Sequence, residues 1–397
     1  MRTSPIICLA LCLVTALALG QSAPGGPAKT GGSAPASAAR ADSSAPAGPA
    51  EASSQAPVGG SAPQAADSFP QAQIANGLIS ARLYLPDTAS GYYRGTRFDW
   101  SGVMPDLDYK GHHYSGQWFA KYAPTIHDAI MGPVESFAPL GYDKAKPGGH
   151  FIAIGIGALT RIDEKPYAPF RYYPIVNPGK WRVKTGSSKA VFVQTLSDSG
   201  YAYAYTKTVR LLKGKAILVL EHKLKNTGQK TIETDVYDHN LFPIDHQPTG
   251  PGLVVSFAFA PGAAEERRIQ TAQEATGRAD AAQASGRPAA GLPGPVALIK
   301  DSQIVFLRRP VNKEDAYCVL SGYGDSPKDY DIRIENRNTG AGMRITGDRP
   351  LSRLVFWASP TTACPEAYVH IRVAPGETFS WTIAYQLYDT STLINKP

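Results

Sequence analysis

The chain has 397 residues and a formal charge of +7, from 40 Lys and Arg against 33 Asp and Glu. The basic residues are spread thinly and form no block of five or more like charges, which argues against nucleic acid as a partner. A modest basic excess is typical of a solvated surface, and attraction to an anionic glycan or envelope is the alternative.

Residues 1–20 have the pattern of a cleavable signal peptide. Arg2 supplies a positive start, and an apolar run follows from Ile6 to Leu19. The run is shorter than the about 20 residues that a membrane helix needs, and no comparable run follows. We therefore expect a secreted protein, periplasmic or extracellular, with no transmembrane segment.

Two segments are biased in composition. Residues 21–70 are almost wholly Ala, Pro, Ser and Gly, so they cannot bury enough apolar surface to offset their ordering entropy, and we predict a disordered linker. Residues 263–295 are rich in Ala, Gly, Arg and Gln and predict a low-complexity surface insertion that could contain a short helix. The rest of 71–397 has the composition of one packed domain.

The segment from Gly91 to Phe137 is dense in polar and aromatic side chains. Aromatic faces stack on the C–H faces of sugars while Arg and His bind hydroxyls, so Arg97, Trp100 and His127 are candidates for a wall of a glycan cleft. The alternative is an irregular β edge with satisfied side chains. The histidines and carboxylates lack a diagnostic metal-ligand spacing, and we predict no metal site.

A glycine-punctuated β run extends from Gly148 to Ile162 and ends in Arg161. Its glycines do not fall as G-x-G-x-x-G before a helix, which argues against a phosphate cradle. On residue pattern alone, a buried strand with Arg161 at its solvent end is the favoured interpretation of the run.

Alternating strands and turn signals fill the rest of the domain. Residues 201–205 place three tyrosines on one face of a strand, and residues 212–215 and 226–229 have turn composition where hairpins would close. Residues 368–373 and 378–387 are predicted strands around a Pro-Gly-Glu turn. More than ten such strands predict an all-β fold with two large, mostly antiparallel sheets packed face to face.

Two positions have the chemistry of proton transfer. His239 lies between Asp238 and Asn240 at a strand exit, where its tautomer can be controlled. Glu366 lies among Cys, Pro and apolar residues, where desolvation would raise its pKa towards neutrality. A satisfied structural histidine and a surface glutamate are the alternatives.

Four cysteines occur, of which Cys8 and Cys12 fall in the predicted signal peptide. Cys318 and Cys364 would remain in a compartment that permits disulfides. A single bridge and two buried thiols are both open, because the pairing geometry cannot be derived from sequence.

The order of these motifs resembles the galactose mutarotase family, the aldose 1-epimerases. That family has a glycine-containing strand ending in Arg-Ile, a later histidine stretch, then C-x-E and P-G-E near the C-terminus. The matching segments here are Gly155 to Ile162, Asp238 to Phe242, Cys364 to Glu366 and Pro375 to Glu377. The resemblance implies the β-supersandwich (galactose mutarotase-like) fold. It also implies Glu366 as general base, His239 as general acid and Arg161 as a substrate binder.

One departure concerns a second histidine, which the family places in a loop before a Trp-containing strand. Residues 167–181 contain no histidine, and Tyr173 is a candidate for that space. Together with Asp238 and Asn240 it completes our set of predicted sugar contacts.

The resemblance implies an isomerase that binds a free sugar and interconverts its anomers by acid–base ring opening. Glu366 and His239 would face one another across the ring, with no metal or organic cofactor. Two alternatives stay open: a non-catalytic carbohydrate-binding protein, and a polysaccharide-processing enzyme that pairs Glu366 with Glu135 or Asp99. The sequence does not disclose the sugar, whether it is free or polymeric, or the oligomeric state.

Overall fold

The computed structural model describes residues 68–263, 295–311 and 314–390. The predicted signal peptide, nearly all of the predicted linker and the interior of the predicted insertion lie outside these residues. Within the described ranges, no helix is both long enough and apolar enough to cross a membrane.

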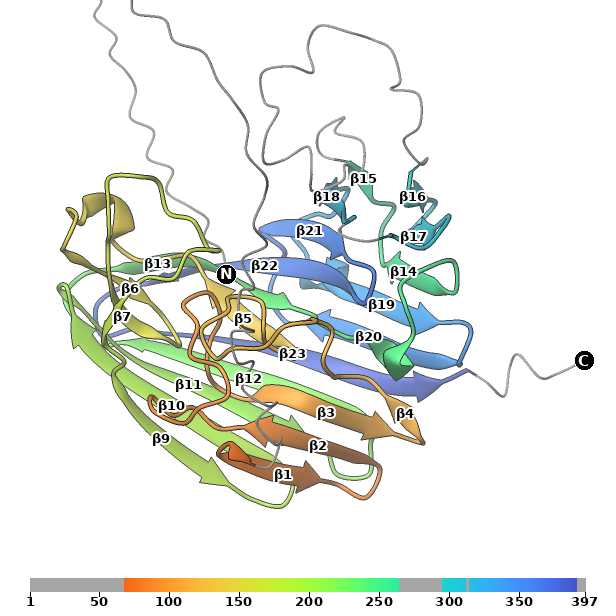
Figure 1. The fold of residues 1–397 in the computed structure, drawn as a ribbon, viewed down its shortest axis with the longest axis horizontal. Coiled ribbons are helices and arrows are strands. Elements are labelled where there is room, and N and C mark those ends of the chain that lie inside the picture. Colours follow the sequence, from red (N-terminus) through yellow and green to blue (C-terminus); the bar gives the residue numbers. More distant parts are fainter. Residues whose placement is uncertain (1–67, 264–294, 312–313, 391–397) are drawn as a thin grey trace, which may run out of the picture. The chain divides into compact units, whose positions relative to one another are not determined.

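Antiparallel strands dominate the described chain (Figure 1). The largest sheet has ten strands, in the order β16 (Ala297–Lys300), β17 (Gln303–Phe306), β14 (Leu253–Phe257), β19 (Asp331–Asn336), β20 (Ala341–Gly347), β23 (Thr378–Asp389), β12 (Ile217–Asn226), β11 (Tyr201–Leu211), β10 (Lys189–Asp198) and β9 (Lys180–Thr185). A six-stranded sheet has the order β15 (Gly262–Ala263), β18 (Ala316–Ser321), β21 (Arg353–Ala358), β22 (Ala363–Val373), β13 (Ile232–His239) and β5 (Val134–Phe137).

Two smaller sheets complete the described fold. One contains β1 (Gln71–Ala75), β2 (Ile79–Tyr84), β3 (Val103–Tyr109) and β4 (His112–His113), and the other contains β6 (His150–Ala153), β7 (Gly157–Thr160) and β8 (Ile175–Asn177). Single-turn 3-10 helices occur at η2 (Tyr142–Lys144), η3 (Ile244–His246) and η4 (Pro327–Asp329).

The six-stranded sheet packs face to face on the ten-stranded sheet. Phe137 of β5 contacts Tyr205 of β11 and Trp381 of β23, with ring centroids 5.4 and 6.1 Å apart. Alternation along β11 explains this packing, because Tyr203 and Tyr205 share one face of the strand and both are buried. The predicted all-β fold with two large antiparallel sheets is confirmed.

One of the two predicted hairpins is correct. Residues 212–215 close the β11–β12 hairpin, but residues 226–229 lead from β12 in the large sheet to β13 in the smaller one. The reason is the buried Asn226, whose amide donates to the backbone oxygens of Lys230 and Val373 and so turns the chain across the sandwich. The predicted strands around Pro375 are likewise β22 and β23, which lie in different sheets.

The glycine-punctuated run forms the β6–β7 hairpin instead of a single strand. Gly155 in its turn has φ +80°, and a Cβ there would lie 2.6 Å from the Asp99 carboxylate. Only glycine allows this close approach in a left-handed conformation. The hairpin therefore packs directly against the Asp99 segment.

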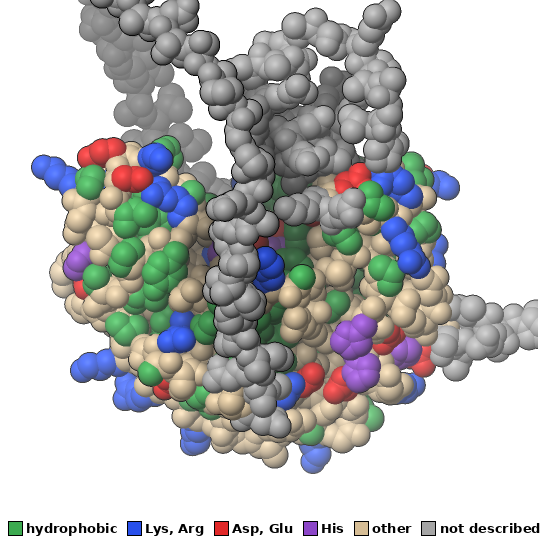
Figure 2. Space-filling model, viewed as in Figure 1, with side chains coloured by type: hydrophobic (Ala, Val, Ile, Leu, Met, Phe, Trp, Pro, Cys, Tyr) green, Lys and Arg blue, Asp and Glu red, His purple; other side chains and the backbone are tan. Residues whose placement is uncertain are grey.

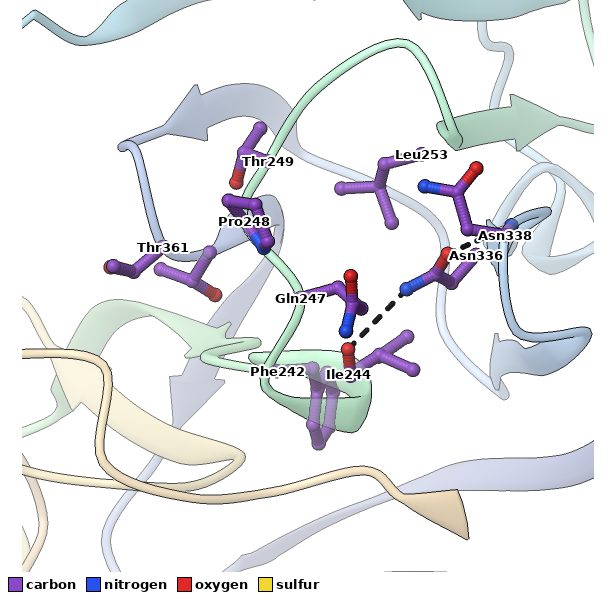
Figure 3. A pocket seen from close by; sticks show the side chains of 10 residues that line it. Phe242, Ile244, Gln247, Pro248, Thr249, Leu253, Asn336, Asn338 and Thr361 are labelled. Carbon is purple, nitrogen blue, oxygen red and sulfur yellow. Dashed lines mark hydrogen bonds between the residues drawn. The ribbon is translucent and has the colours of Figure 1, made fainter. Parts of the chain in front are cut away.

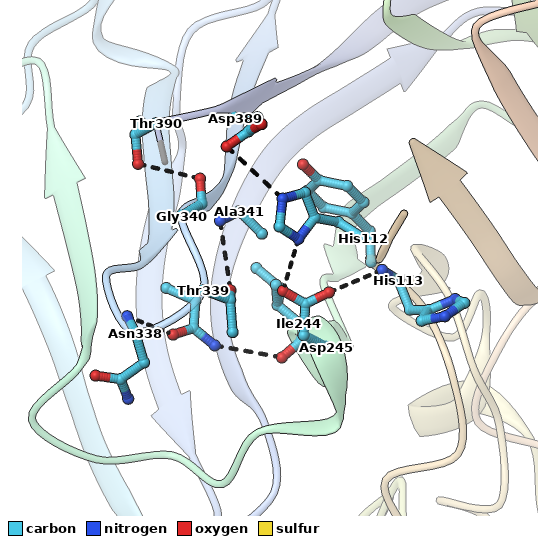
Figure 4. Close-up of polar contacts among 12 residues, drawn as sticks. His112, His113, Ile244, Asp245, Asn338, Thr339, Gly340, Ala341, Asp389 and Thr390 are labelled. Atoms are coloured by element: carbon cyan, nitrogen blue, oxygen red, sulfur yellow. Dashed lines mark hydrogen bonds and ion pairs between the residues drawn. The ribbon is translucent and has the colours of Figure 1, made fainter. Parts of the chain in front are cut away.

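A histidine-rich patch lies where β4 meets η3 and the end of β23 (Figures 2 and 4). His112 Nδ1 lies 3.0 Å from one Asp245 carboxylate oxygen, and the His113 backbone N–H donates to the other at 2.9 Å. His112 Nε2 lies 3.7 Å from Asp389. These contacts attach the small sheet to the sandwich.

Candidate functional site

Strand pairing brings the two predicted proton-transfer residues together. Tyr237 of β13 pairs with Tyr368 of β22 in antiparallel register. His239 lies two residues after Tyr237 and Glu366 two residues before Tyr368, so both lie towards the same end of this strand pair. Residues two apart share a face of a strand, so all four side chains lie on the outer face of the six-stranded sheet. His239 Nε2 is 3.6 Å from Glu366 Oε1.

This separation is smaller than the width of a sugar ring, so the expectation that the two groups face one another across the ring is wrong. Both are nearly closed to solvent, with His239 3% and Glu366 7% exposed. The anomeric hydroxyl and the ring oxygen of a sugar are bonded to the same carbon. An adjacent acid and base can therefore address both oxygens from one side.

Burial changes the acid–base properties of both groups. It raises the pKa of Glu366 to about 7, although the Arg97 charge and a hydrogen bond from Tyr368 oppose the rise. Burial, and then the Arg97 charge, lower the pKa of His239 well below its usual value. Near neutral pH, the mobile proton of this pair therefore resides on Glu366 for much of the time, while His239 stays neutral.

Arg97 supplies the fixed positive charge of the site. Its guanidinium carbon lies 4.6 Å from the ring centroid of Phe98 and 4.7 Å from that of Phe170, and Arg97 forms an ion pair with Asp128. It also donates to the Tyr237 hydroxyl at 3.3 Å. The contact with Tyr237 places Arg97 beside the pair, and its binding of substrate stays a prediction.

His127 and Phe170 border Arg97 on the solvent side. His127 Nδ1 is 2.8 Å from Asp128 Oδ2, and its ring lies 5.3 Å from that of Phe170. Phe170 is 60% exposed. These contacts join His127 to Asp128 and Phe170, and its binding of substrate stays a prediction.

Solved structures of aldose 1-epimerase and galactose mutarotase-like proteins are similar to this chain. A galactose mutarotase related enzyme from Lactobacillus acidophilus matches with TM-score 0.46 and 10% identity, over 81% of this chain and 98% of that one. An aldose epimerase homologue from C. elegans matches with TM-score 0.44 and 12% identity, over 80% and 98%. A galactose mutarotase-like protein from Clostridium acetobutylicum matches with TM-score 0.46 and 13% identity, over 80% and 94%. No family model and no curated protein matches the sequence.

Asp238 and Asn240 do not accompany His239. The Asp238 side chain lies on the opposite face of β13, inside the sandwich, and Asn240 follows the end of that strand; the Tyr385 hydroxyl donates to Asp238 at 2.6 Å and to Asn240 at 3.0 Å. Adjacent strand residues point to opposite faces, which explains the difference. The prediction that these two residues bind sugar beside His239 is therefore corrected.

Three other predicted sugar contacts are occupied with structural tasks. The guanidinium of Arg161 donates to backbone carbonyls, including those of Tyr142, Ala145 and Asp163. The Trp100 indole donates to a backbone oxygen at 2.9 Å and is 3% exposed. Tyr173 is fully buried. None of these contacts joins the residues to His239 or Glu366, so their predicted role in binding sugar gains no support.

Several site residues were missed from sequence. Tyr237 and Tyr368 stack with centroids 4.5 Å apart beside the pair, and Trp357 of β21 lies with its edge towards the His239 ring at 5.4 Å. The signal for the two tyrosines was their two-residue spacing from His239 and Glu366. Trp357 carried no such signal, because the sequence does not show that β21 pairs with β22.

Cys364 touches His239 directly. Its sulfur is 2.6 Å from His239 Nδ1 and accepts the backbone N–H of Asn240 at 2.9 Å. Cys318 and Cys364 are both free and buried, so of the two interpretations of these cysteines the structure has the buried thiols. Burial raises the pKa of the Cys364 thiol well above its usual value.

His239, Cys364 and Glu366 are also the kinds of side chain that bind transition metals. Sulfur and nitrogen ligands of one zinc ion lie about 3.5 Å apart at tetrahedral geometry, given Zn–S near 2.3 Å and Zn–N near 2.0 Å. The 2.6 Å between Sγ and Nδ1 is shorter than that ligand separation and leaves the two side chains in direct contact. The neighbouring Arg97 charge also disfavours a cation.

A small hollow elsewhere in the structure is separate from this pair. Figure 3 shows it beside η3, with Gln247, Thr249 and Asn336 among its lining residues. Neither His239 nor Glu366 lines it. The candidate site is therefore identified by the contacts of His239 and Glu366 and not by this hollow.

Proposed function

We propose that this protein is an exported carbohydrate-active isomerase that interconverts sugar anomers, in the manner of an aldose 1-epimerase. The observation that carries the proposal is the buried contact between Glu366 and His239, 3.6 Å apart. Burial brings one group to a pKa near 7 and keeps the other neutral, which gives an acid and a base in direct reach of one another.

The reaction needs one group that can donate a proton and one unprotonated group that can accept one. Protonated Glu366 delivers its proton to the ring oxygen while His239 Nε2 takes the proton of the anomeric hydroxyl. The bond between the first carbon and the ring oxygen breaks, and the carbonyl of the open aldehyde forms. Rotation about the adjoining carbon–carbon bond and the reverse transfers then close the ring on its other face.

The family resemblance implies the opposite starting roles, with Glu366 as base and protonated His239 as acid. Both versions contain the same number of protons. Burial of His239 beside Arg97 favours the version that starts with the proton on Glu366. Each positioned proton transfer contributes about 10²–10⁴ in rate.

Sugar hydroxyls and the sugar's apolar face would be met by the groups bordering the pair. Arg97 and His127 offer donors, and the exposed ring of Phe170 offers a stacking surface. The polysaccharide-processing alternative has less support, because Glu135 and Asp99 are buried within the sandwich and face away from Glu366.

Polarimetry of freshly dissolved α-glucose and α-galactose tests the proposal. The protein should speed the change in optical rotation, and Glu366→Gln and His239→Asn should each slow the catalysed rate by about 10² or more while sugar binding survives. The matched controls are Glu233→Gln and His370→Asn, because both lie on the same two strands at exposed positions and should leave the rate unchanged.

Two results would point elsewhere. Monosaccharide binding without any change in mutarotation rate would favour a carbohydrate-binding protein. Binding of an oligosaccharide in the absence of any effect on monosaccharides would move attention to a glycan substrate at the border formed by Phe170 and His127.

A further inference from the structure

We propose that Cys364 is a positioning residue, whose uncharged sulfur accepts the Nδ1–H of His239 and thereby presents the Nε2 lone pair to Glu366. This inference rests on the proposed function for its kinetic consequence. Its structural core, the tautomer of His239, can be measured without any reaction.

The contacts come from one short stretch of paired strand. His239 ends β13 and Cys364 lies near the start of β22, with Nδ1 and Sγ 2.6 Å apart. The other ring nitrogen of His239 faces Glu366. The imidazole is therefore held at both nitrogens, and the partner at Nδ1 decides what Nε2 can do.

A thiol can act as donor or as acceptor, and the surroundings favour acceptance. The backbone N–H of Asn240 donates to Sγ, so the sulfur already accepts one hydrogen bond at this position. Protonated Glu366 needs an acceptor at Nε2, and neutral imidazole has one only when its proton is on Nδ1. An S–H donated to Nδ1 would instead place two protons between Nε2 and the Glu366 hydroxyl.

Sulfur is an unusual partner for a histidine of this chain. Six of its eight histidines have a carboxylate at a ring nitrogen within 3.2 Å: His112, His113, His127, His150, His222 and His370. A carboxylate orients imidazole and also stabilises its protonated form. The uncharged thiol orients His239 without stabilising its protonated form, so the imidazole remains a neutral, unprotonated base before the reaction begins.

Replacement of Cys364 separates orientation from charge. Cys364→Ala removes the acceptor, so we expect a mixture of both neutral tautomers of His239 and a fall of about 10-fold in kcat with little change in KM. Cys364→Ser keeps an uncharged donor and acceptor and should retain the tautomer. Cys364→Asp should make His239 protonate at higher pH and shift the pH profile of kcat.

The primary measurement is ¹⁵N NMR of the labelled full chain, with His239→Asn to assign the ring signals. The expected result is a neutral Nδ1–H ring in the unsubstituted protein and in Cys318→Ser, the control at the other cysteine. Thermal unfolding of each variant establishes that it is folded.

A neutral Nε2–H ring in the unsubstituted protein would overturn the inference, as would an unchanged tautomer in Cys364→Ala. Loss of the Nδ1–H tautomer in Cys364→Ala would support the inference even if no mutarotation is found, in which case the proposed function alone fails. Mutarotation with an Nε2–H ring would leave the proposed function standing and remove the role of Cys364.

Discussion

Glu135 and Glu366 are both buried carboxylates of the six-stranded sheet, and they lie on opposite faces of it. Glu135 points into the sandwich, where it forms an ion pair with Lys207 and lies 2.5 Å from His222 Nε2. Burial alone would raise the pKa of Glu135, but these two partners lower it to about 2. Glu366 lies on the outer face without so close a cation, and its pKa rises to about 7.

The difference lies in distance to the cation. Both glutamates lose water, but only Glu135 has opposite charge in direct contact, from strands of the facing sheet. A buried carboxylate whose charge is compensated by a cation of the facing sheet, such as Glu135, links the two sheets. A buried carboxylate without such a contact, such as Glu366, has a pKa near neutrality and can exchange a proton. One sheet thus carries a carboxylate with a lowered pKa on its inner face and one with a raised pKa on its outer face.

Removing the cation from the inner face should have the largest effect. Lys207→Met leaves the Glu135 charge buried with one partner fewer, and we expect the free energy of unfolding to fall by about 3–5 kcal/mol in urea titrations. Lys223→Met, at an exposed position of β12, should change it by less than about 0.5 kcal/mol.

The double variant Glu135→Gln with Lys207→Met sharpens this comparison. Removal of both charges should restore a large part of the lost stability, because no buried charge is then left alone. If the double variant is less stable than Lys207→Met, the unpaired charge of Glu135 is not the cause of the lost stability.

The pH dependence of stability should expose the outer carboxylate. The pKa of Glu366 is raised to about 7 in the folded protein from an ordinary value near 4.5, so its contribution is fully present below about pH 4.5. It is lost as pH rises through 7. Each pKa unit corresponds to about 1.4 kcal/mol, so the total is about 3 kcal/mol.

Urea unfolding between pH 4.5 and 8 of the unsubstituted protein and of Glu366→Gln measures this contribution. The difference between them should change by about 3 kcal/mol in favour of Glu366→Gln as pH rises. Parallel curves would show that Glu366 titrates as an ordinary carboxyl, and the contrast with Glu135 would then disappear.

The smallest effect is expected at the exposed border of the site. Phe170→Ala removes a ring that stacks on Arg97 and offers a face to a sugar, and such contacts contribute about 0.5–1.5 kcal/mol. KM for an accepted sugar should rise by about 2- to 10-fold, with kcat nearly unchanged. Leu78→Ala, at a similarly exposed apolar residue remote from the pair in sequence, is the control.

The fold was predictable because strand alternation is a local property. Residues 201–205 show by themselves which side chains share a face, and the β11–β12 turn has ordinary hairpin composition. The two crossings between sheets were not predictable, because the Asn226 turn has the same composition as a hairpin. Its destination depends on hydrogen bonds to Val373, 147 residues away.

The proximity of His239 and Glu366 was predictable from the sequence, whereas the residues around them were mostly not. His239 and Glu366 were found from motif order, and both lie together. Alternation alone does not say which face of a strand is the inner one, so Asp238 and Asn240 were placed with His239. The ion pair of Glu135 was not predictable either, since its partner Lys207 comes from a strand 72 residues away.

The two crossings between the sheets also bind one another. The Gly376 N–H donates to the Asn226 carbonyl, and the Asn226 N–H donates to the Glu377 carbonyl, each at 3.0 Å. The strands that carry His239 and Glu366 are thus direct continuations of β12 and β23, which pair side by side in the large sheet. For engineering, β13 and β22 cannot be exchanged as a cassette, and neither crossing is a suitable place to open the chain in a circular permutant.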